Sequence, residues 1–139
     1  MKIYFAGSIR GGREDKDIYI AIIKLLLKYG TVLTEHIGKS ELSEMGETNM
    51  TEEEIYQRDI NWINESDIVI AEVTSPSLGV GYEIGYAELK GKKIICIYRE
   101  VETGKKLSAM IYGNSNLKVA KYKKIEELPN LFDKIFDNK

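Results

Sequence analysis

Short apolar runs alternate along this sequence with longer stretches whose apolar residues recur at helical spacing. The first run covers residues 3–6 and ends at Gly7. The stretch after it ends at Gly30, and glycine is a typical residue at helix C-termini. Its apolar members at helical spacing are Ile18, Ile22, Leu25, Leu26 and Tyr29. A strand followed by a helix is therefore predicted at the N-terminus.

The same rhythm continues to the C-terminus. Thr51, followed three residues later by Glu54, forms a capping box that predicts a helix start, and this helix extends to about residue 65. Residues 34–50 lack periodicity and are interpreted as a long loop. The remaining predicted elements are strands over 31–33, 67–73, 93–98 and 117–122 and helices over 78–90 and 125–136.

This order predicts one α/β domain over residues 1–139, with a doubly wound, Rossmann-like (flavodoxin-like) fold. We expect a five-stranded parallel sheet in the order 2-1-3-4-5, with helices on both faces. In such sheets ligands bind at the carboxyl ends of the strands that flank the switch point, here the first and third strands. The binding site should therefore use residues 7–13 and 74–83.

Composition excludes several classes of function. A net charge of −2 argues against a broad nucleic-acid surface. With Cys96 as the single cysteine and His36 as the single histidine, we expect no intrachain disulfide, metal site or cofactor. Cys96 itself is interpreted as an inert core residue. The first apolar run is too short for a signal peptide, and no run reaches membrane-spanning length, so a cytoplasmic location is expected.

The glycine-rich turn over residues 7–13 is a candidate anion site. Between a strand and a helix it offers backbone N–H groups, the Ser8 hydroxyl and the Arg10 guanidinium. It matches neither a Walker A loop nor G-x-G-x-x-G. A tight turn that needs glycine, with Arg10 simply solvated, is the alternative. The position at the switch point favours the ligand-binding interpretation.

Glu83 is a candidate nucleophile or base. It lies three residues after Val80 and four before Ala87, which belong to the inward stripe of the predicted helix over 78–90. The carboxylate should therefore lie beside the core near the start of that helix, where the helix dipole favours its ionised form. A first-turn glutamate that serves only the dipole is the alternative.

Asp59 also lies on an apolar stripe, which includes Ile55, Trp62 and Ile63. A buried charge without a partner is costly, so this carboxylate needs either a partner or a function. A buried ion pair with Arg58 or Arg10 is the alternative to a function. We expect Arg58 to point elsewhere on the helix, because it is the adjacent residue.

Two carboxylates beside an anion-binding turn, without a metal, form the arrangement expected for cleavage of a glycosidic bond. The hydroxyl of Tyr4 could reach the same cleft, although simple core packing also accounts for this residue. His36 follows the second predicted strand and could contact a base. A surface role explains His36 equally well.

Four stretches of the chain resemble the 2'-deoxynucleoside 5'-phosphate N-hydrolases, within the nucleoside 2-deoxyribosyltransferase superfamily. They are YFAGSIRGGRED (4–15), GTVLTEH (30–36), AEVTSPSLGVGYEIG (71–85) and LSAMI (107–111). These stretches occur in the family's order and span most of the chain. Residues 40–50 depart from the family pattern, which leaves the preferred base open.

The resemblance implies a role for each matching residue. Glu83 would be the nucleophile that forms a glycosyl-enzyme at C1' of deoxyribose, Asp59 would assist it, and Tyr4 would line the sugar site. Related enzymes that act on ribonucleotides tend to carry Phe where this chain has Tyr4, which favours deoxyribose. The positions that match phosphate-binding and sugar-binding residues are Ser8, Ile9, Arg10, Gly11, Ser77 and Gly79. Ser108, with Met110 beside it, would be contributed by the other subunit of a homodimer. Water would then release 2-deoxyribose 5-phosphate and the free base.

Two other functions remain open. A deoxyribosyltransferase would pass the sugar to a second base, but the phosphate-binding set argues against it, because those transferases mostly use unphosphorylated nucleosides. A non-catalytic nucleotide sensor has little need for two inward-facing carboxylates, which makes Glu83 and Asp59 evidence against that reading.

Overall fold

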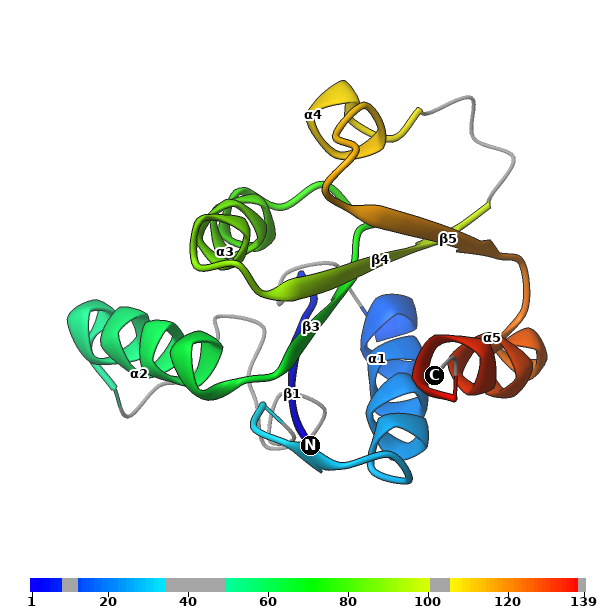
Figure 1. The fold of residues 1–139 in the computed structure, drawn as a ribbon, viewed down its shortest axis with the longest axis horizontal. Helices are drawn as coiled ribbons and strands as arrows, with labels where there is room; N and C mark the ends of the chain where they lie inside the picture. Colours follow the sequence, from blue (N-terminus) through cyan, green and yellow to red (C-terminus); the bar gives the residue numbers. More distant parts are fainter. Residues whose placement is uncertain (9–12, 35–49, 101–105, 138–139) are drawn as a thin grey trace.

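The fold is a five-stranded parallel sheet in the order β2-β1-β3-β4-β5, which confirms the predicted topology (Figure 1). The structure is a computed structural model, and it describes residues 1–8, 13–34, 50–100 and 106–137. The strands are β1 (Lys2–Ala6), β2 (Thr31–Val32), β3 (Ile68–Glu72), β4 (Lys93–Arg99) and β5 (Lys118–Tyr122). β1 pairs with both β2 and β3, so the switch point lies where the sequence predicts it.

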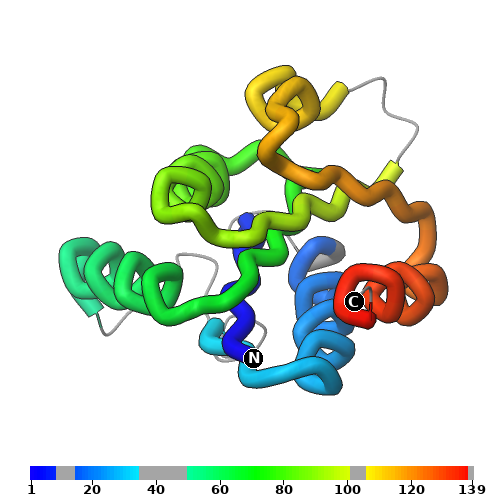
Figure 2. The backbone as a smooth tube through the Cα atoms, in the orientation of Figure 1, coloured from blue at the N-terminus to red at the C-terminus, as the bar shows by residue number. Residues whose placement is uncertain are grey.

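Helices cover both faces of the sheet. They are α1 (Arg13–Leu26), α2 (Glu52–Glu65), α3 (Leu78–Leu89), α4 (Ala109–Tyr112) and α5 (Leu128–Phe136), with a 3₁₀ turn, η2 (Ile125–Glu127). The tube in Figure 2 shows α2 and α3 on one side of the sheet and α1 and α5 on the other. None of the helices in the described part of the chain has both the length and the apolar character to cross a membrane.

Alternation along the strands divides the core into two clusters. In β1, Ile3 and Phe5 face the cluster that contains residues of α1 and α5. Tyr4, between them, faces the cluster that contains Val80 and Ile84 of α3. Successive side chains of a strand point to opposite faces, so the β1 register decides that the Tyr4 side chain lies on the α2–α3 side. Cys96 is fully buried in this second cluster.

The structure differs from the predicted elements in two places. The closing segment, predicted as one helix, is a 3₁₀ turn followed by α5, which begins at Leu128. Pro129 explains the break, because proline lacks an N–H and is accommodated in the first turn of a helix. α4 was not predicted, since its four residues are too short to show a periodic pattern.

The helix starts next to the site are capped by side chains. Thr51 Oγ1 accepts the Glu54 N–H at 3.1 Å, and Glu54 Oε1 accepts the Thr51 N–H at 3.1 Å, which confirms the predicted capping box at α2. At α3, Ser77 Oγ accepts the Val80 N–H at 3.2 Å. Both helices therefore begin at a defined residue on the carboxyl-end side of the sheet.

Candidate active site

Tyr4 and Glu83 meet on the α2–α3 face of the sheet. Tyr4 is 1% exposed, and its hydroxyl donates a hydrogen bond to Glu83 Oε2. The strand register places Tyr4 on this face, and the inward stripe of α3, with Val80 and Ala87 buried, turns the adjacent Glu83 toward β1. The sequence left core packing and a site role open for Tyr4, and the structure shows that Tyr4 is both buried and in contact with the carboxylate.

Burial dominates the electrostatics of Glu83. Removal from water raises the pKa of Glu83 to about 7, the hydrogen bond from Tyr4 opposes this shift, and the negative charge of Asp59 adds to it. The helix dipole was expected to favour the ionised carboxylate, but desolvation outweighs it. Burial, followed by the charges of Glu83 and Asp59, also raises the pKa of Tyr4, so its phenol remains a neutral donor.

Asp59 has the partner that the sequence argument rejected. Arg58 Nε and Nη2 donate to Asp59 Oδ1 at 3.0 and 2.9 Å, so the expectation that Arg58 points elsewhere was wrong. The Arg58 guanidinium lies over the Trp62 ring, 4.6 Å from its centroid, and this fold-back brings it to the neighbouring carboxylate. The ion pair compensates the charge of Asp59, and the field of Asp59 still reaches Glu83.

The apolar stripe of α2 is centred differently from the predicted one. Ile63 is buried as predicted, together with Ile60, which the predicted stripe left out, whereas Ile55 and Trp62 are only half-buried. Asp59 is accordingly half-buried at the edge of the stripe and not at its centre. This position leaves the carboxylate partly exposed to solvent.

The anion-binding turn is described only in part. Ile9, Arg10 and Gly11 lie outside the described residues, as does His36. The Ser8 N–H donates to Tyr19 Oη at 3.0 Å, so this amide already has a partner and only the Ser8 hydroxyl remains as its contribution to an anion.

Gly7 is required by close packing. A Cβ at this position would lie 3.0 Å from the Tyr19 ring and 3.1 Å from the Phe5 ring, which is tighter than ordinary contacts. The glycine therefore lets the strand end pass directly against the two aromatic rings.

Ser77 and Gly79 lie beside Glu83 at the N-terminus of α3. A Cβ added at Gly79 would lie 3.9 Å from both Glu83 Oε1 and Ser77 Oγ. These are ordinary contact distances, so Gly79 lies where the Glu83 carboxylate and the helix start converge. A helix N-terminus attracts anions through its free N–H groups and its dipole, so this corner can hold a phosphate close to a carboxylate.

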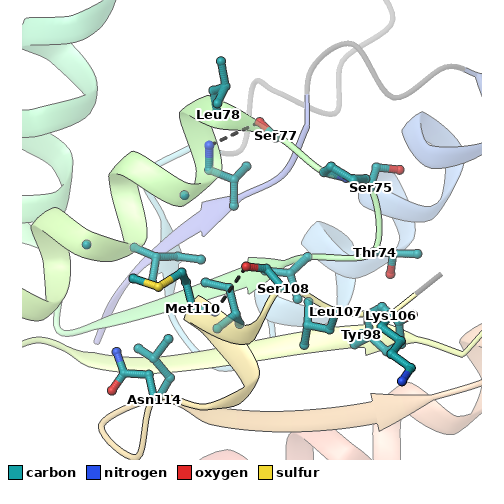
Figure 3. Close-up of a pocket in the computed structure, with 18 of the residues that line it drawn as sticks. Thr74, Ser75, Ser77, Leu78, Tyr98, Lys106, Leu107, Ser108, Met110 and Asn114 are labelled. Atoms are coloured by element: carbon teal, nitrogen blue, oxygen red, sulfur yellow. Dashed lines mark hydrogen bonds between the residues drawn. The ribbon is translucent and has the colours of Figure 1, made fainter.

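Ser108 and Met110 lie on the other side of α3. Ser108 caps α4 by accepting the Met110 N–H at 3.2 Å. Ser108 and Met110 line a cavity of about 530 Å³ together with Ser77 and with the α3 residues Val80 and Ile84 (Figure 3). Glu83 is turned away from this cavity toward Tyr4, so within one chain Ser108 and Glu83 belong to opposite sides of α3.

Sequence reasoning missed a set of buried polar residues at the carboxyl edge of the sheet. Glu72, at the end of β3, is 2% exposed, accepts the Thr74 N–H at 2.7 Å and accepts a hydrogen bond from the Tyr122 hydroxyl. Burial raises its pKa, and those hydrogen bonds oppose the rise. Its signal in the sequence is a carboxylate within the apolar run over 67–73. Asp15, in α1, is also buried and pairs with Arg99 at 3.3 Å.

Within the described ranges, no group of three side chains of the metal-binding types is gathered in one place. The groups gathered at the switch point are a half-buried carboxylate, a neutral phenol, an ion-paired aspartate and a helix N-terminus. These groups can attack an electron-poor carbon, orient a sugar and hold an anion.

The comparisons with known proteins agree on one family. Residues 3–123 match the family model described as nucleoside 2-deoxyribosyltransferase. The chain is 48% identical to the 5-hydroxymethyl-dUMP N-hydrolase of Danio rerio, with 99% of this chain and 96% of that protein covered. The protein of the same name from Esox lucius is 50% identical, with coverages of 98% and 96%. For the human protein of that name the identity is 45%, with coverages of 97% and 79%.

Solved structures show the same fold at lower sequence identity. A CMP N-glycosidase of Clostridium botulinum superimposes with a TM-score of 0.66 at 24% identity, covering 96% of this chain and 99% of that one. A 2-deoxyribosyltransferase of Bacillus psychrosaccharolyticus gives a TM-score of 0.65 at 21% identity, with coverages of 94% and 91%.

Proposed function

Because this chain belongs to the nucleoside 2-deoxyribosyltransferase family, we propose that it hydrolyses the N-glycosidic bond of 2'-deoxynucleoside 5'-monophosphates. The observation that carries the proposal is the hydrogen-bonded pair of Tyr4 and Glu83 at the switch point of the sheet. The relatives at 45–50% identity, which are named N-hydrolases, support water as the acceptor. The products are the free base and 2-deoxyribose 5-phosphate.

The reaction takes place in two steps. The ionised Glu83 carboxylate attacks C1', a C–O bond forms to the carboxylate, and the C1'–N bond breaks as the base leaves with the electron pair. Water then attacks C1', and the ester bond to Glu83 breaks to regenerate the carboxylate. Tyr4 holds the attacking carboxylate in place through its hydrogen bond. The departing base takes up a proton from solvent. Asp59 accepts the proton of the attacking water and releases it to solvent, which balances the first transfer, and it also contacts the sugar.

The 5'-phosphate is bound by the N-terminus of α3 and by residues of the glycine-rich turn. Ser77 and Gly79 lie at that helix start, with Gly79 next to the Glu83 carboxylate. Ser8 supplies its hydroxyl from the turn, and Ile9, Arg10 and Gly11 complete it. His36 is proposed to contact the base. Because the protein carries a net charge of −2, its overall charge does not attract the phosphate. The helix N-terminus and the glycine-rich turn have to do so.

A product assay tests the proposal. Purified protein is incubated with deoxynucleoside monophosphates, ribonucleoside monophosphates and unphosphorylated deoxynucleosides, and free base is measured by chromatography. The names of the relatives make 5-hydroxymethyl-dUMP the first substrate to include. In this assay we expect base from deoxynucleotides alone. In the cell, we propose that the reaction takes place in the cytoplasm. Equal release from unphosphorylated deoxynucleosides would contradict the phosphate requirement.

The same assay separates the alternatives. With a second free base added, a transferase would produce a new nucleotide, whereas the hydrolase produces 2-deoxyribose 5-phosphate. A sensor would bind the deoxynucleotide and leave it intact after prolonged incubation. Either result would replace the proposed hydrolysis.

We also propose a homodimer in which Ser108 completes the phosphate site of the partner. Leu78 and Met110 are 97% and 80% exposed beside the cavity that contains Ser108, which leaves an apolar surface for a second copy. Sedimentation gives the oligomeric state. Mixing two inactive variants, Ser108→Asp and Glu83→Gln, should restore about a quarter of the activity through heterodimers with one intact site. Two monomeric species, or a mixture without activity, would contradict the shared site.

A further inference from the structure

A buried carboxylate outside the proposed chemistry links three segments at the ligand edge of the sheet. Asp15, 7% exposed in the first turn of α1, accepts a hydrogen bond from Ser75 Oγ. Arg99, at the end of β4, donates to the other carboxylate oxygen from Nη2 at 3.3 Å. Asp15 thus connects the helix that follows the glycine-rich turn with the loop that leads into α3.

The loop before α3 is fixed at successive residues. The Thr74 N–H donates to Glu72 Oε1 at 2.7 Å, and Thr74 Oγ1 accepts the Arg99 N–H at 2.8 Å. Ser75 is held by Asp15, and Ser77 caps α3. Figure 3 shows Ser75 directed toward α1 and Ser77 directed toward the first turn of α3.

Pro76 makes this loop stiff. Proline fixes its own φ and restricts the residue before it, so little freedom remains between the Ser75 and Ser77 anchors. A change in the position of Ser75 must therefore move Ser77 and the first N–H groups of α3.

We infer that the Asp15–Ser75 hydrogen bond positions the N-terminus of α3 for the substrate's 5'-phosphate, with Ser75 and Asp15 as positioning residues. This inference rests on the proposed function. The two segments proposed to bind the phosphate lie about 60 positions apart in the sequence, and the Asp15–Ser75 hydrogen bond joins α1, which follows the first, to the loop that precedes the second. A carboxylate so close to an anion site would repel the ligand, and the ion pair with Arg99 removes most of that repulsion.

Ser75→Ala tests the inference. It removes one hydroxyl and leaves the residues proposed to touch the substrate unchanged. We expect the KM for a deoxynucleoside monophosphate to rise about tenfold with kcat within about twofold of wild type, because phosphate binding is uniform in ground and transition states. The inhibition constant of inorganic phosphate should rise in parallel. Ser75→Thr, which keeps the hydroxyl, should restore both values.

Tyr29→Phe is the matched control. Like Ser75→Ala, it removes one hydroxyl that donates to an aspartate. Here the Tyr29 hydroxyl donates to Asp133 of α5, away from the ligand edge. Its KM and kcat should equal those of wild type. If Ser75→Ala melts below this control, Asp15→Asn, which keeps the shape and weakens the acceptor, should show the same rise in KM.

An unchanged KM in folded Ser75→Ala would overturn the inference, whether or not kcat falls. A wild-type protein that releases no base from any nucleotide would instead overturn the proposed function. In that case calorimetric binding of inorganic phosphate to wild type and Ser75→Ala still decides the inference, since equal affinities would exclude a positioning role.

Discussion

The Tyr4 hydroxyl donates a hydrogen bond to the Glu83 carboxylate across 79 positions of sequence. The phenol is buried and its pKa is raised, so it stays protonated and serves as a permanent donor. Glu83, by contrast, has a pKa of about 7 and is about half ionised at neutral pH. The pair therefore combines a fixed donor with a carboxylate that titrates in the physiological range. This suits a group that is the nucleophile at C1' in the first step and the leaving group in the second.

Replacement of Glu83 by glutamine should abolish turnover while the enzyme still binds its substrate. Glutamine keeps the shape and can accept the Tyr4 hydrogen bond, but it cannot form the ester to C1'. We expect a loss in kcat of at least about 10³-fold, with the affinity for the deoxynucleotide within a few-fold of wild type. Single-turnover product assays and calorimetry measure the two quantities. A variant with near-native kcat would remove Glu83 from the role of nucleophile.

Two neighbours of Glu83 should shift the pH profile in opposite directions. Asp59 raises the pKa of Glu83 and the Tyr4 hydrogen bond lowers it, although burial is the largest cause of its elevation. Wild-type kcat/KM should therefore fall as pH drops through about 7, as the carboxylate becomes protonated. Asp59→Asn should move this fall in kcat/KM to lower pH, and Tyr4→Phe should move it to higher pH.

The kcat/KM profiles of the three proteins measured over the same buffers check this expectation. Tyr56→Phe, on the exposed side of α2, is the control and should leave the fall in kcat/KM in place. Shifts of Asp59→Asn and Tyr4→Phe in the same direction would contradict the electrostatic account.

Glu83→Gln should also be more stable than wild type at alkaline pH. Because the folded-state pKa of Glu83 lies above its ordinary value of 4.5, the folded protein binds this proton more tightly than the unfolded chain does. The contribution of Glu83 to the unfolding free energy is therefore greatest below pH 4.5 and falls as pH rises to about 7. Thermal melting should show a higher Tm for the variant at pH 8 and little difference at pH 5. A Tm advantage of equal size at both values would point to packing and not to charge.

The backbone arrangement of the site could be predicted from the sequence. The helical pattern places Glu83 beside the inward stripe of α3, and the parallel topology brings residues 74–83 next to the end of β1, whereas the sequence left the role of Tyr4 open. These inferences depend on short-range patterns that hydrophobic burial enforces, since a shift of one residue would exchange the two faces of β1 and move Tyr4 to the α1–α5 side.

Side-chain partners could not be predicted in the same way. Arg58 was expected to avoid Asp59 because adjacent helix residues point in different directions, but its long side chain folds back over Trp62 and reaches the carboxylate. The Asp15–Ser75 contact joins residues 60 positions apart through rotamers that no periodic pattern encodes. Buried polar networks are therefore the part of this site that required the structure.

A comparison of two helix caps can separate phosphate binding from helix stability. Ser77 caps α3 and Thr51 caps α2, each by accepting a backbone N–H three residues later, at 3.2 and 3.1 Å. Loss of either cap should cost about 1 kcal/mol in the free energy of unfolding. Ser77→Ala should in addition raise the KM for the deoxynucleotide about tenfold with kcat nearly unchanged, since Ser77 is proposed to bind the phosphate. Thr51→Ala, with an equal loss of stability in denaturant titrations, should keep the wild-type KM. An equal rise in KM for both variants would show that weaker helix starts, and not a missing phosphate contact, account for the effect.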